Sequence, residues 1–450
     1  MIMINKIKAN GHIVLMVMAP VALMGFLFAQ NGESTKSAPP VVQSGTIPAT
    51  PARPFPGQRI PALPANPAVP QPRLTCAKSS QFSMLSLLDP SWSIKDPAPL
   101  IDNYYTYHYR VETMLKSRSG ALFVAGYKST NSGWAPVMHK STDSGVSWKL
   151  ARLPLDNEKP GWSMVYSMVE DNNSVIYAGG TGLWKSSDNG NTWIALPMPW
   201  PDVYLGGSVP IFSMFVTKNN ALVAAFNDWS APESNNFSTP SRAYKSVDGG
   251  STWNEIFSRN VATVSIVEAD DGSLVFRDWL GPDNGGVSRY SDGVITQTFI
   301  DNFARLVDYN AELLKARDGS LYFIAVDTAV DLAAIDYTQP GHALLATYKS
   351  VDNGKTWKKL GTLPNSWSIQ GPIIETADGI LYFPSYSVCN ATDSLYKSTD
   401  KGVTWSVVAA APEFRSRRPG HEYYYGISSL IENSGNILIG GNAPVIFTAK

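Results

Sequence analysis

A nine-residue pattern occurs five times in this chain, and it constrains the fold more than any other feature of the sequence. Each copy reads K-S-x-D-x-G-x-[ST]-W, and the copies span residues 140–148, 185–193, 245–253, 349–357 and 397–405. Their aspartates are Asp143, Asp188, Asp248, Asp352 and Asp400, with spacings of 45, 60, 104 and 48 residues. The spacing of 104 is about twice the others, so we expect a degenerate copy within it. The segment 289–299, "RYSDGVITQTF", keeps Ser, Asp and Gly but lacks the Trp, and we predict that it is this copy.

A second repeat alternates with the first. It consists of an apolar run, a short polar turn and another apolar run. It occurs seven times, from "VETMLKSRSGALFVAG" at 111–126 to "ISSLIENSGNILIGG" at 427–441. Turn tips of Asp-Gly, Asn-Asn and Ser-Gly between apolar runs are typical of β-hairpins.

The two repeats together predict a unit of four short strands. The hairpin supplies the first two strands, and the nine-residue segment joins the third to the fourth. Units of about 40–60 residues with four strands indicate a β-propeller. We therefore predict an all-β chain that forms a seven-bladed propeller of four-stranded antiparallel blades. The seventh unit stops after its third strand, so we expect an N-terminal strand near residues 91–96, "SWSIKD", to close the last blade.

The nine-residue segments resemble the Asp-box, or BNR repeat, S-x-D-x-G-x-x-W, of the sialidase-like superfamily. The resemblance covers about residues 90–450. It implies a β-propeller, because the repeat occurs in the propellers of sialidases, xyloglucan hydrolases, a photosystem assembly factor and sorting receptors. Both enzymes and receptors carry it, so the resemblance leaves the activity open.

Simple turn chemistry accounts for the repeated residues. The Asp carboxylate can accept hydrogen bonds from backbone N–H groups of its own turn. The Gly allows a positive φ, and the Trp can pack over the turn. None of these groups is a nucleophile or a base, so we predict that the five repeated aspartates are structural.

The composition excludes several function classes. Acidic and basic residues nearly cancel, 37 against 36, so no basic field exists to bind nucleic acid. The five histidines are scattered, and no Gly-rich phosphate loop or Ser-His-Asp pattern is present. We predict neither a metal nor a cofactor.

The N-terminal part predicts export. Residues 1–29 carry an apolar run after two lysines, which fits a signal peptide or an uncleaved signal anchor. Residues 30–75 form a Pro-rich tether, and 76–450 form the propeller. We expect a secreted, periplasmic or cell-surface protein, with membrane contact only if the segment stays uncleaved. In such a protein the two cysteines, Cys76 and Cys389, are expected to form a disulfide.

The predicted strand order places the long connections opposite the nine-residue segments, and binding residues concentrate on long loops held by a rigid scaffold. We therefore expect the ligand at the axis of that face. The candidate ligand-binding residues are Arg110, Trp229, Arg277, Trp279, Arg418 and His421. Aromatic rings beside charged groups suit sugars, and they also suit a protein partner. The charged groups could instead pair with one another and form no site.

Catalysis stays undecided at this point. Asp228, Asp278 and Glu422 are candidates for a carboxylate pair that would hydrolyse a glycosidic bond. Tyr425 lies two residues before the "ISSL" run, whereas the sialidase tyrosine directly precedes such a run. Two hypotheses remain open: a propeller that recognises, with or without cleaving, carbohydrate, and a non-catalytic propeller that binds a protein partner.

Overall fold

The computed structural model describes most of the predicted strands and few of the long connections. The described residues are 8–9, 12–13, 80–81, 83–86, 109–130, 133–154, 164–198, 210–227, 240–281, 284–301, 312–327, 329, 345–387, 392–410, 414–415, 422–423, 427–441 and 445–449. The chain divides into two compact units, Met1–Gln58 and Arg59–Lys450. The predicted domain boundaries at residues 29 and 75 lie outside the described ranges and stay predictions.

The first unit contains two short strands, β1 (Lys8–Ala9) and β2 (His12–Ile13), which pair antiparallel. All other strands belong to the second unit. Within the described part of the chain, no helix is long and apolar enough to cross a membrane.

The second unit is a β-propeller of antiparallel sheets, and six of these sheets have four strands. The first is β5 (Tyr109–Lys116), β6 (Leu122–Thr130), β7 (Gly133–Ser141) and β8 (Lys149–Leu150). The second is β9 (Val165–Glu170), β10 (Ile176–Gly180), β11 (Leu183–Ser186) and β12 (Ile194–Leu196). The third is β13 (Ile211–Val216), β14 (Leu222–Asn227), β15 (Ser241–Ser246) and β16 (Asn254–Arg259).

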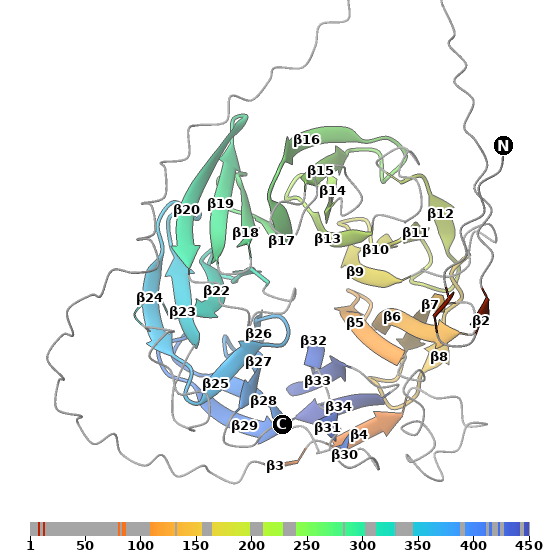
Figure 1. Ribbon diagram of the computed structural model, residues 1–450. Coiled ribbons are helices and arrows are strands. Elements are labelled where there is room, and N and C mark those ends of the chain that lie inside the picture. Colours follow the sequence, from red (N-terminus) through yellow and green to blue (C-terminus); the bar gives the residue numbers. More distant parts are fainter. Residues whose placement is uncertain are drawn as a thin grey trace, which may run out of the picture. The chain divides into compact units, whose positions relative to one another are not determined.

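Two more four-stranded sheets follow in chain order. One is β17 (Ala262–Glu268), β18 (Leu274–Gly281), β19 (Asn284–Ser291) and β20 (Val294–Asp301). The other is β21 (Leu314–Lys315), β22 (Leu321–Val326), β23 (Leu345–Ser350) and β24 (Lys358–Thr362). In each of these sheets the chain runs from the innermost strand to the outermost, with β5, β9, β13 and β17 facing the common centre (Figure 1).

The next sheet departs from the predicted four strands and has six. Its strands are β25 (Ser366–Ile369), β26 (Ile374–Glu375), β27 (Leu381–Ser387), β28 (Thr392–Ser398), β29 (Ser406–Ala410) and β3 (Ser80–Gln81). Both β25 and β26 pair with β27, because Pro372 interrupts the inner strand and has no N–H group to donate. β3 adds to β29 in parallel.

The last four-stranded sheet combines strands from distant parts of the chain. It contains β32 (Ile427–Asn433), β33 (Asn436–Gly441), β34 (Val445–Ala449) and β4 (Ser83–Ser86). β4 pairs antiparallel with β34. The segment 91–96, which we expected at this place, lies outside the described ranges. A separate pair, β30 (Phe414–Arg415) and β31 (Glu422–Tyr423), precedes this sheet.

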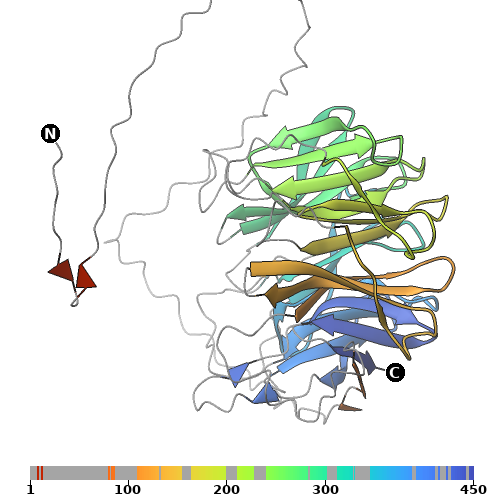
Figure 2. The same cartoon turned by 90° about the vertical axis from the view of Figure 1, so that its right-hand side faces the viewer.

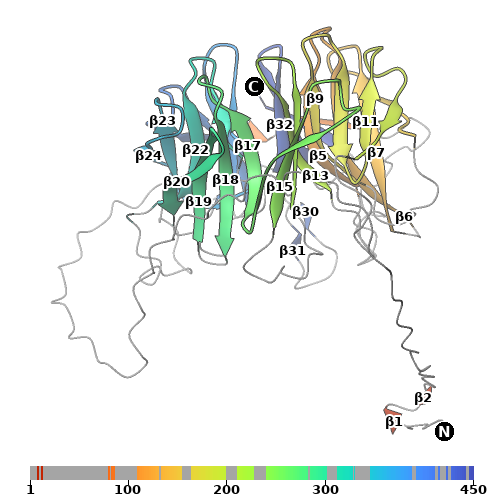
Figure 3. The same cartoon turned by 90° about the horizontal axis from the view of Figure 1, so that it is seen from above.

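The prediction of seven four-stranded blades is therefore wrong in its count. The structure has six four-stranded sheets, and the β25–β29 sheet is larger. The all-β propeller of antiparallel four-stranded blades is confirmed. The described short turns gather at one end of the strands (Figures 2 and 3).

The hydrophobic core lies between successive sheets. One cluster joins Phe123 of β6 to Met168 of β9 and Trp184 of β11, and another joins Val275 of β18 to Phe323 of β22. The second strands β10, β14 and β22 are buried along their whole length, while the outer strands β12 and β24 are mostly exposed. The apolar runs of the hairpin repeat therefore form the inner half of each sheet.

A glutamate at the end of an inner strand latches one sheet to the next. The Oε2 atom of Glu170 accepts a hydrogen bond at 2.7 Å from the backbone N–H of Arg118, which lies in the hairpin turn of the preceding sheet. Glu268, Glu375 and Glu432 do the same for Lys218 N, Arg317 N and Ala377 N at 2.7, 2.8 and 2.7 Å. These latches lie at the short-turn end of the strands.

Candidate functional site

The five nine-residue segments, which we call the nonapeptide turns, share one hydrogen-bond arrangement. In the first, Ser141 Oγ donates to Asp143 Oδ1 at 2.7 Å and accepts from Gly145 N at 2.9 Å. Asp143 Oδ1 also accepts from Ser147 N at 2.9 Å, and Oδ2 accepts from the Ser147 hydroxyl. The corresponding Ser or Thr N–H and Asp Oδ1 atoms are 2.8–2.9 Å apart at Asp188, Asp248, Asp352 and Asp400. The repeated Ser, Asp and Ser/Thr therefore close each turn.

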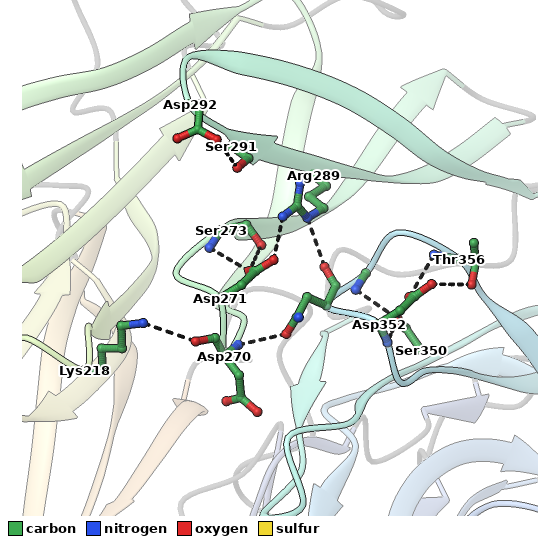
Figure 4. Close-up of polar contacts among 12 residues, drawn as sticks. Lys218, Asp270, Asp271, Ser273, Arg289, Ser291, Asp292, Ser350, Asp352 and Thr356 are labelled. Carbon is green, nitrogen blue, oxygen red and sulfur yellow. Dashed lines mark hydrogen bonds and ion pairs between the residues drawn. The ribbon is translucent and has the colours of Figure 1, made fainter.

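The degenerate copy at 289–299 does not form such a turn. Asp292 and Gly293 both have positive φ, 53° and 81°, and Ser291 pairs directly with Val294. This is a two-residue hairpin turn between β19 and β20. Figure 4 shows Asp292 bonded to Ser291 alone, whereas Asp352 contacts both Ser350 and Thr356.

The nine-residue pattern also contains a Lys at its first position and a Trp at its last, and both make contacts that hold the turn. Lys140 Nζ donates to Asn189 O at 2.6 Å and thereby reaches the nonapeptide turn of the next sheet. Arg289 makes the same contact with Asn353 O at 3.1 Å (Figure 4). The indole N–H of Trp148 donates to Gly145 O within its own turn at 3.0 Å. These residues hold turns and sheets together.

We expect the nonapeptide turns to make the protein sensitive to acid. Hydrogen bonds from Thr192 lower the pKa of Asp188 to about 2, and those from Ser147 do the same for Asp143. A carboxylate whose pKa is lower when folded than the usual value of about 3.9 stabilises the fold above that value. This stabilisation is lost as the pH falls from about 4 to about 2.

The measurement is the thermal midpoint of Asp188→Asn between pH 7 and pH 2. The variant is expected to have a lower midpoint at pH 7 and a smaller decline in acid than the wild type. Asp292→Asn is the matched control, because Asp292 lacks the bonds to the turn backbone, and its curve should follow the wild type. Equal acid slopes for the Asp188 variant and the wild type would contradict the assignment.

Asp278, a predicted catalytic candidate, is fully buried in a structural ion pair. Its side chain is 0% exposed and pairs with the Arg259 guanidinium of the preceding sheet, with NH1 and Oδ2 3.1 Å apart. The Ser288 hydroxyl donates to the same carboxylate. Arg259 also donates to Thr263 Oγ1 at 2.6 Å and lies over the Phe276 ring at 4.6 Å. These contacts favour the alternative in which the charged groups pair with one another.

Arg277, a predicted ligand-binding residue, is also 0% exposed. Its NH1 donates to Gly286 O at 3.0 Å, and its guanidinium lies over the Phe323 ring at 4.9 Å. Arg277 and Asp278 are adjacent in β18 and therefore point to opposite faces, and both faces of β18 are covered by neighbouring sheets. Trp279, two residues after Arg277, belongs to β18, but its side chain lies outside the described part.

Arg110, a predicted ligand-binding residue, has a side chain that is 28% exposed and lies beside other polar groups. Its Nε lies 3.0 Å from Glu112 Oε1, and the Glu112 side chain is 9% exposed. Tyr127 of β6 hydrogen-bonds Arg110, and its ring makes an edge contact with Trp134 at 4.8 Å. Burial raises the pKa of the Tyr127 hydroxyl, and the charge of Glu112 adds to that rise.

Two aromatic residues of the following sheets extend this group. Burial raises the pKa of Tyr166 well above its usual value, and Glu112 and Tyr127 contribute to the rise. The Tyr166 hydroxyl donates to Met164 Sδ at 2.7 Å, and its ring lies 5.1 Å from Phe212. We call Arg110, Glu112, Tyr127, Trp134, Tyr166 and Phe212 the axial cluster. Its phenols keep their protons at neutral pH and can donate hydrogen bonds.

Three members of the axial cluster lie on inner strands, and each of them is the extra residue of a β-bulge. The register shifts between Val111 and Thr113, so Glu112 is the extra residue of β5. Tyr166 and Phe212 are the extra residues of β9 and β13. A bulge bends its strand and redirects a side chain. Gly126 permits the first bulge, because a Cβ there would lie 1.9 Å from Arg110 O.

The other predicted site residues cannot be placed. Glu422 belongs to β31, but its side chain is not described. The following lie outside the described ranges: Asp228, Trp229, Arg418, His421, Tyr425, Cys76 and Cys389. Among the residues that are described, no three His, Cys, Asp or Glu side chains are grouped so as to hold a metal ion.

Sequence reasoning missed Glu112, Tyr127 and Tyr166. Glu112 and Tyr166 lie within apolar runs of the hairpin repeat, Tyr127 directly follows one, and none of the three belongs to a motif. The sequence offered one signal for such site residues. It was a polar residue at the start of an inner strand, which is the end away from the hairpin turn. The axial cluster lies at that end of the strands, opposite the nonapeptide turns.

Comparisons with known proteins give weak relatives. No family model matches the chain. A stretch covering 49% of this chain is 26% identical to a xyloglucanase of a Paenibacillus species and covers 23% of that protein. Another, covering 58% of this chain, is 25% identical to xyloglucanase Xgh74A of Acetivibrio thermocellus and covers 34% of it. The matched stretches thus span about a third or less of these relatives.

Among solved structures, oligogalacturonate lyase in complex with manganese aligns with a TM-score of 0.51 at 11% identity. The alignment covers 84% of this chain and 99% of that one. At this identity the likeness concerns the fold alone. The chain is a β-propeller with weak sequence similarity to xyloglucanases.

Proposed function

We propose that the chain is an exported Asp-box propeller that recognises carbohydrate at the axis of the face opposite the nonapeptide turns. The axial cluster is the observation that carries this proposal. It joins aromatic rings to an ion pair and to protonated phenols, and sugar rings use such groups for stacking and for hydrogen bonds. The similarity to xyloglucanases over about half of the chain supports the ligand class.

We further propose that the ligand is a neutral glycan. A carboxylated sugar needs a cationic partner that is not already neutralised. In the part of the chain that is described, Arg110 lies against Glu112, Arg259 against Asp278, and Arg277 is fully buried. These arginines are engaged within the protein, so a neutral polysaccharide such as xyloglucan fits better than an acidic one.

The proposal includes closure of the last four-stranded sheet by an N-terminal strand. Pairing of β4 with β34, four residues on each, supports this closure. The shared bonds of the five nonapeptide turns support their assignment as Asp-boxes. The apolar run that follows two lysines within residues 1–29 supports export.

A direct binding measurement tests the function. Purified residues 76–450 are titrated with xyloglucan oligosaccharides, and with oligogalacturonate as the acidic comparison. We expect binding of the neutral ligand only. Glu112→Gln is expected to weaken it about ten- to a hundredfold, because hydrogen bonds to charged groups contribute about 1.5–3 kcal/mol.

Two further variants complete the design. Trp134→Ala should weaken binding through loss of an aromatic surface, while Val351→Ser should leave it unchanged. Val351 is 79% exposed on a nonapeptide turn, at the opposite end of the strands. Preferential binding of oligogalacturonate would overturn the neutral ligand. Absence of binding to either glycan would favour the alternative, a protein partner.

The proposed disulfide has its own test. If Cys76 and Cys389 are bonded, the bridge stabilises the fold by about 2–4 kcal/mol by constraining the unfolded chain. Denatured, unreduced protein from an oxidising compartment is expected to show no free thiols in a thiol-counting assay. Two free thiols would contradict the bridge.

A further inference from the structure

The β17–β20 sheet has a two-residue turn where five other sheets have a nonapeptide turn. Ser291 pairs directly with Val294 across this turn, so β20 begins at once and runs for eight residues. The outermost strands of the other sheets contain two to six residues. Among the strands that the structure describes, β20 is therefore the longest one on an outer edge of the ring (Figure 1).

The outer edge of β20 lacks the features that protect an edge strand. Natural edges are short, carry charges, or lie under another segment. β8, β12 and β4 have two, three and four residues, β16 carries Glu255 and Arg259, and β24 begins with two lysines. β29 is covered, because β3 pairs with it. β20 carries one charged residue, Asp301 at its end, and pairs with β19 alone among the described strands.

Another sheet of the ring already accepts an added strand at the equivalent position. Phe299 pairs with Val287 just after a register shift in β20, and Ala409 pairs with Leu395 just after the corresponding shift in β29. Ala409 is also the residue at which β3 joins, opposite Ser80. A β-bulge can turn an edge away from a partner, but in β29 it does not prevent pairing. The bulge of β20 therefore leaves its edge available.

β20 is held in place by the neighbouring sheet and exposes apolar side chains near both ends. Thr298 Oγ1 accepts the indole N–H of Trp357 at 3.1 Å, and Phe299 packs against the core of the next sheet. Val294 and Ile300 are each 59% exposed. A strand that is already fixed loses little further freedom when it pairs, and the exposed apolar groups gain contacts.

We propose that β20 is a dimerisation strand, which pairs antiparallel with β20 of a second copy of this chain. A two-fold axis relates two identical strands in this way and joins two four-stranded sheets into one of eight. Asp301 of each copy lies at opposite ends of the pair, so no like charges face one another. The uncharged stretch from Val294 to Ile300 thus suits a second β20 better than a charged strand.

This arrangement has two consequences. Pairing reverses the strand direction between the copies, so the two axial clusters open in opposite directions. One strand per copy is a small interface, and we therefore expect a reversible dimer. Dimerisation is independent of the proposed carbohydrate binding.

Analytical ultracentrifugation of the full chain over a wide range of concentrations tests the proposal. We expect the wild type to be monomeric at low concentration and dimeric at high concentration. Gln297→Lys places a charge in the middle of β20, close to the same charge of the second copy. It is expected to weaken dimerisation more than about tenfold, because like charges that face one another across a strand pair are destabilising. Gln297 is exposed, so the thermal midpoint should stay unchanged.

Ile194→Lys is the matched control. Ile194 is 59% exposed on β12, an outer strand of three residues, and this variant should dimerise like the wild type. Association through the apolar run of residues 1–29 would persist in both variants. Equal dimerisation of Gln297→Lys and Ile194→Lys would therefore overturn the proposal.

Hydrogen exchange identifies the surface that pairs. The amides of residues 294–301 are expected to exchange more slowly in the dimer than in the monomer. Protection confined to another surface would overturn the proposal, and so would a monomer at every concentration. In that monomer, slow exchange of 294–301 would show that a segment of the same chain covers the edge, and fast exchange would leave the edge to a different partner.

Discussion

Replacing Asp278 by alanine is expected to lower the free energy of unfolding by about 3–5 kcal/mol, the usual cost of removing one partner of a buried ion pair. Asp278 is 0% exposed and joins the β17–β20 sheet to Arg259 of the preceding sheet. Without the carboxylate, the guanidinium would stay buried between sheets with its charge uncompensated. Denaturant unfolding at neutral pH measures the change.

A more exposed pair provides the control; it joins β15 to the outer strand β16, which also carries Arg259. Arg242 NH1 and Glu255 Oε2 are 3.7 Å apart, with side chains 33% and 41% exposed. Exposed pairs contribute about 0–1 kcal/mol, so Glu255→Ala should change stability little. If Asp278→Ala were as mild as Glu255→Ala and instead abolished glycan binding, Asp278 would be a ligand-binding residue after all.

The second large effect is expected for Trp405→Ala, at about 3–5 kcal/mol, the usual range for removing a large buried aromatic side chain. Trp405 is 6% exposed and packs in the core between the β21–β24 sheet and its own. Its indole N–H donates at 2.7 Å to Thr347 Oγ1, which is fully buried. The substitution therefore leaves a cavity and an unsatisfied hydroxyl.

Trp148→Ala is the matched variant in another nonapeptide turn. Trp148 is half-buried and bonds Gly145 O within its own turn, so a smaller loss is expected. The comparison uses chemical denaturation of both variants. Equal losses would show that the tryptophans act only on their own turns and not between sheets.

Much of the fold was predictable because its repeats have short-range causes. The Asp, Gly and Ser of a nonapeptide turn bond within nine residues, so the turn is visible in the sequence itself. The segment at 289–299 misled for the same reason. Asp292 and Gly293 suit a two-residue hairpin turn as well as a longer turn. The missing Trp was the feature that distinguished this segment from the nonapeptide turns.

The larger sheet and the axial cluster were less predictable. Pro372 was visible in the sequence, but its effect depends on which strand it interrupts. Asp278 and Arg259 are distant enough in sequence that their pairing follows from packing between sheets and not from a motif. The direction of the Glu112 side chain is set by a β-bulge, which shifts the register between two strands. No particular residue type marks such a bulge in the sequence, so it could not be predicted. The sequence therefore predicted a site on the face opposite the nonapeptide turns, but it did not point to Glu112, Tyr127 or Tyr166.

The glutamate latches have a consequence for how such a ring can change over evolutionary time. Each latch binds a main-chain N–H, so the neighbouring turn contributes no particular side chain to the joint. The donors are accordingly the backbones of Arg118, Lys218, Arg317 and Ala377, while the acceptor is always glutamate. A unit that carries its own glutamate can join almost any neighbour. Whole units can thus be duplicated or exchanged without matched substitutions beside them, and their opposite ends are free to diverge toward new ligands.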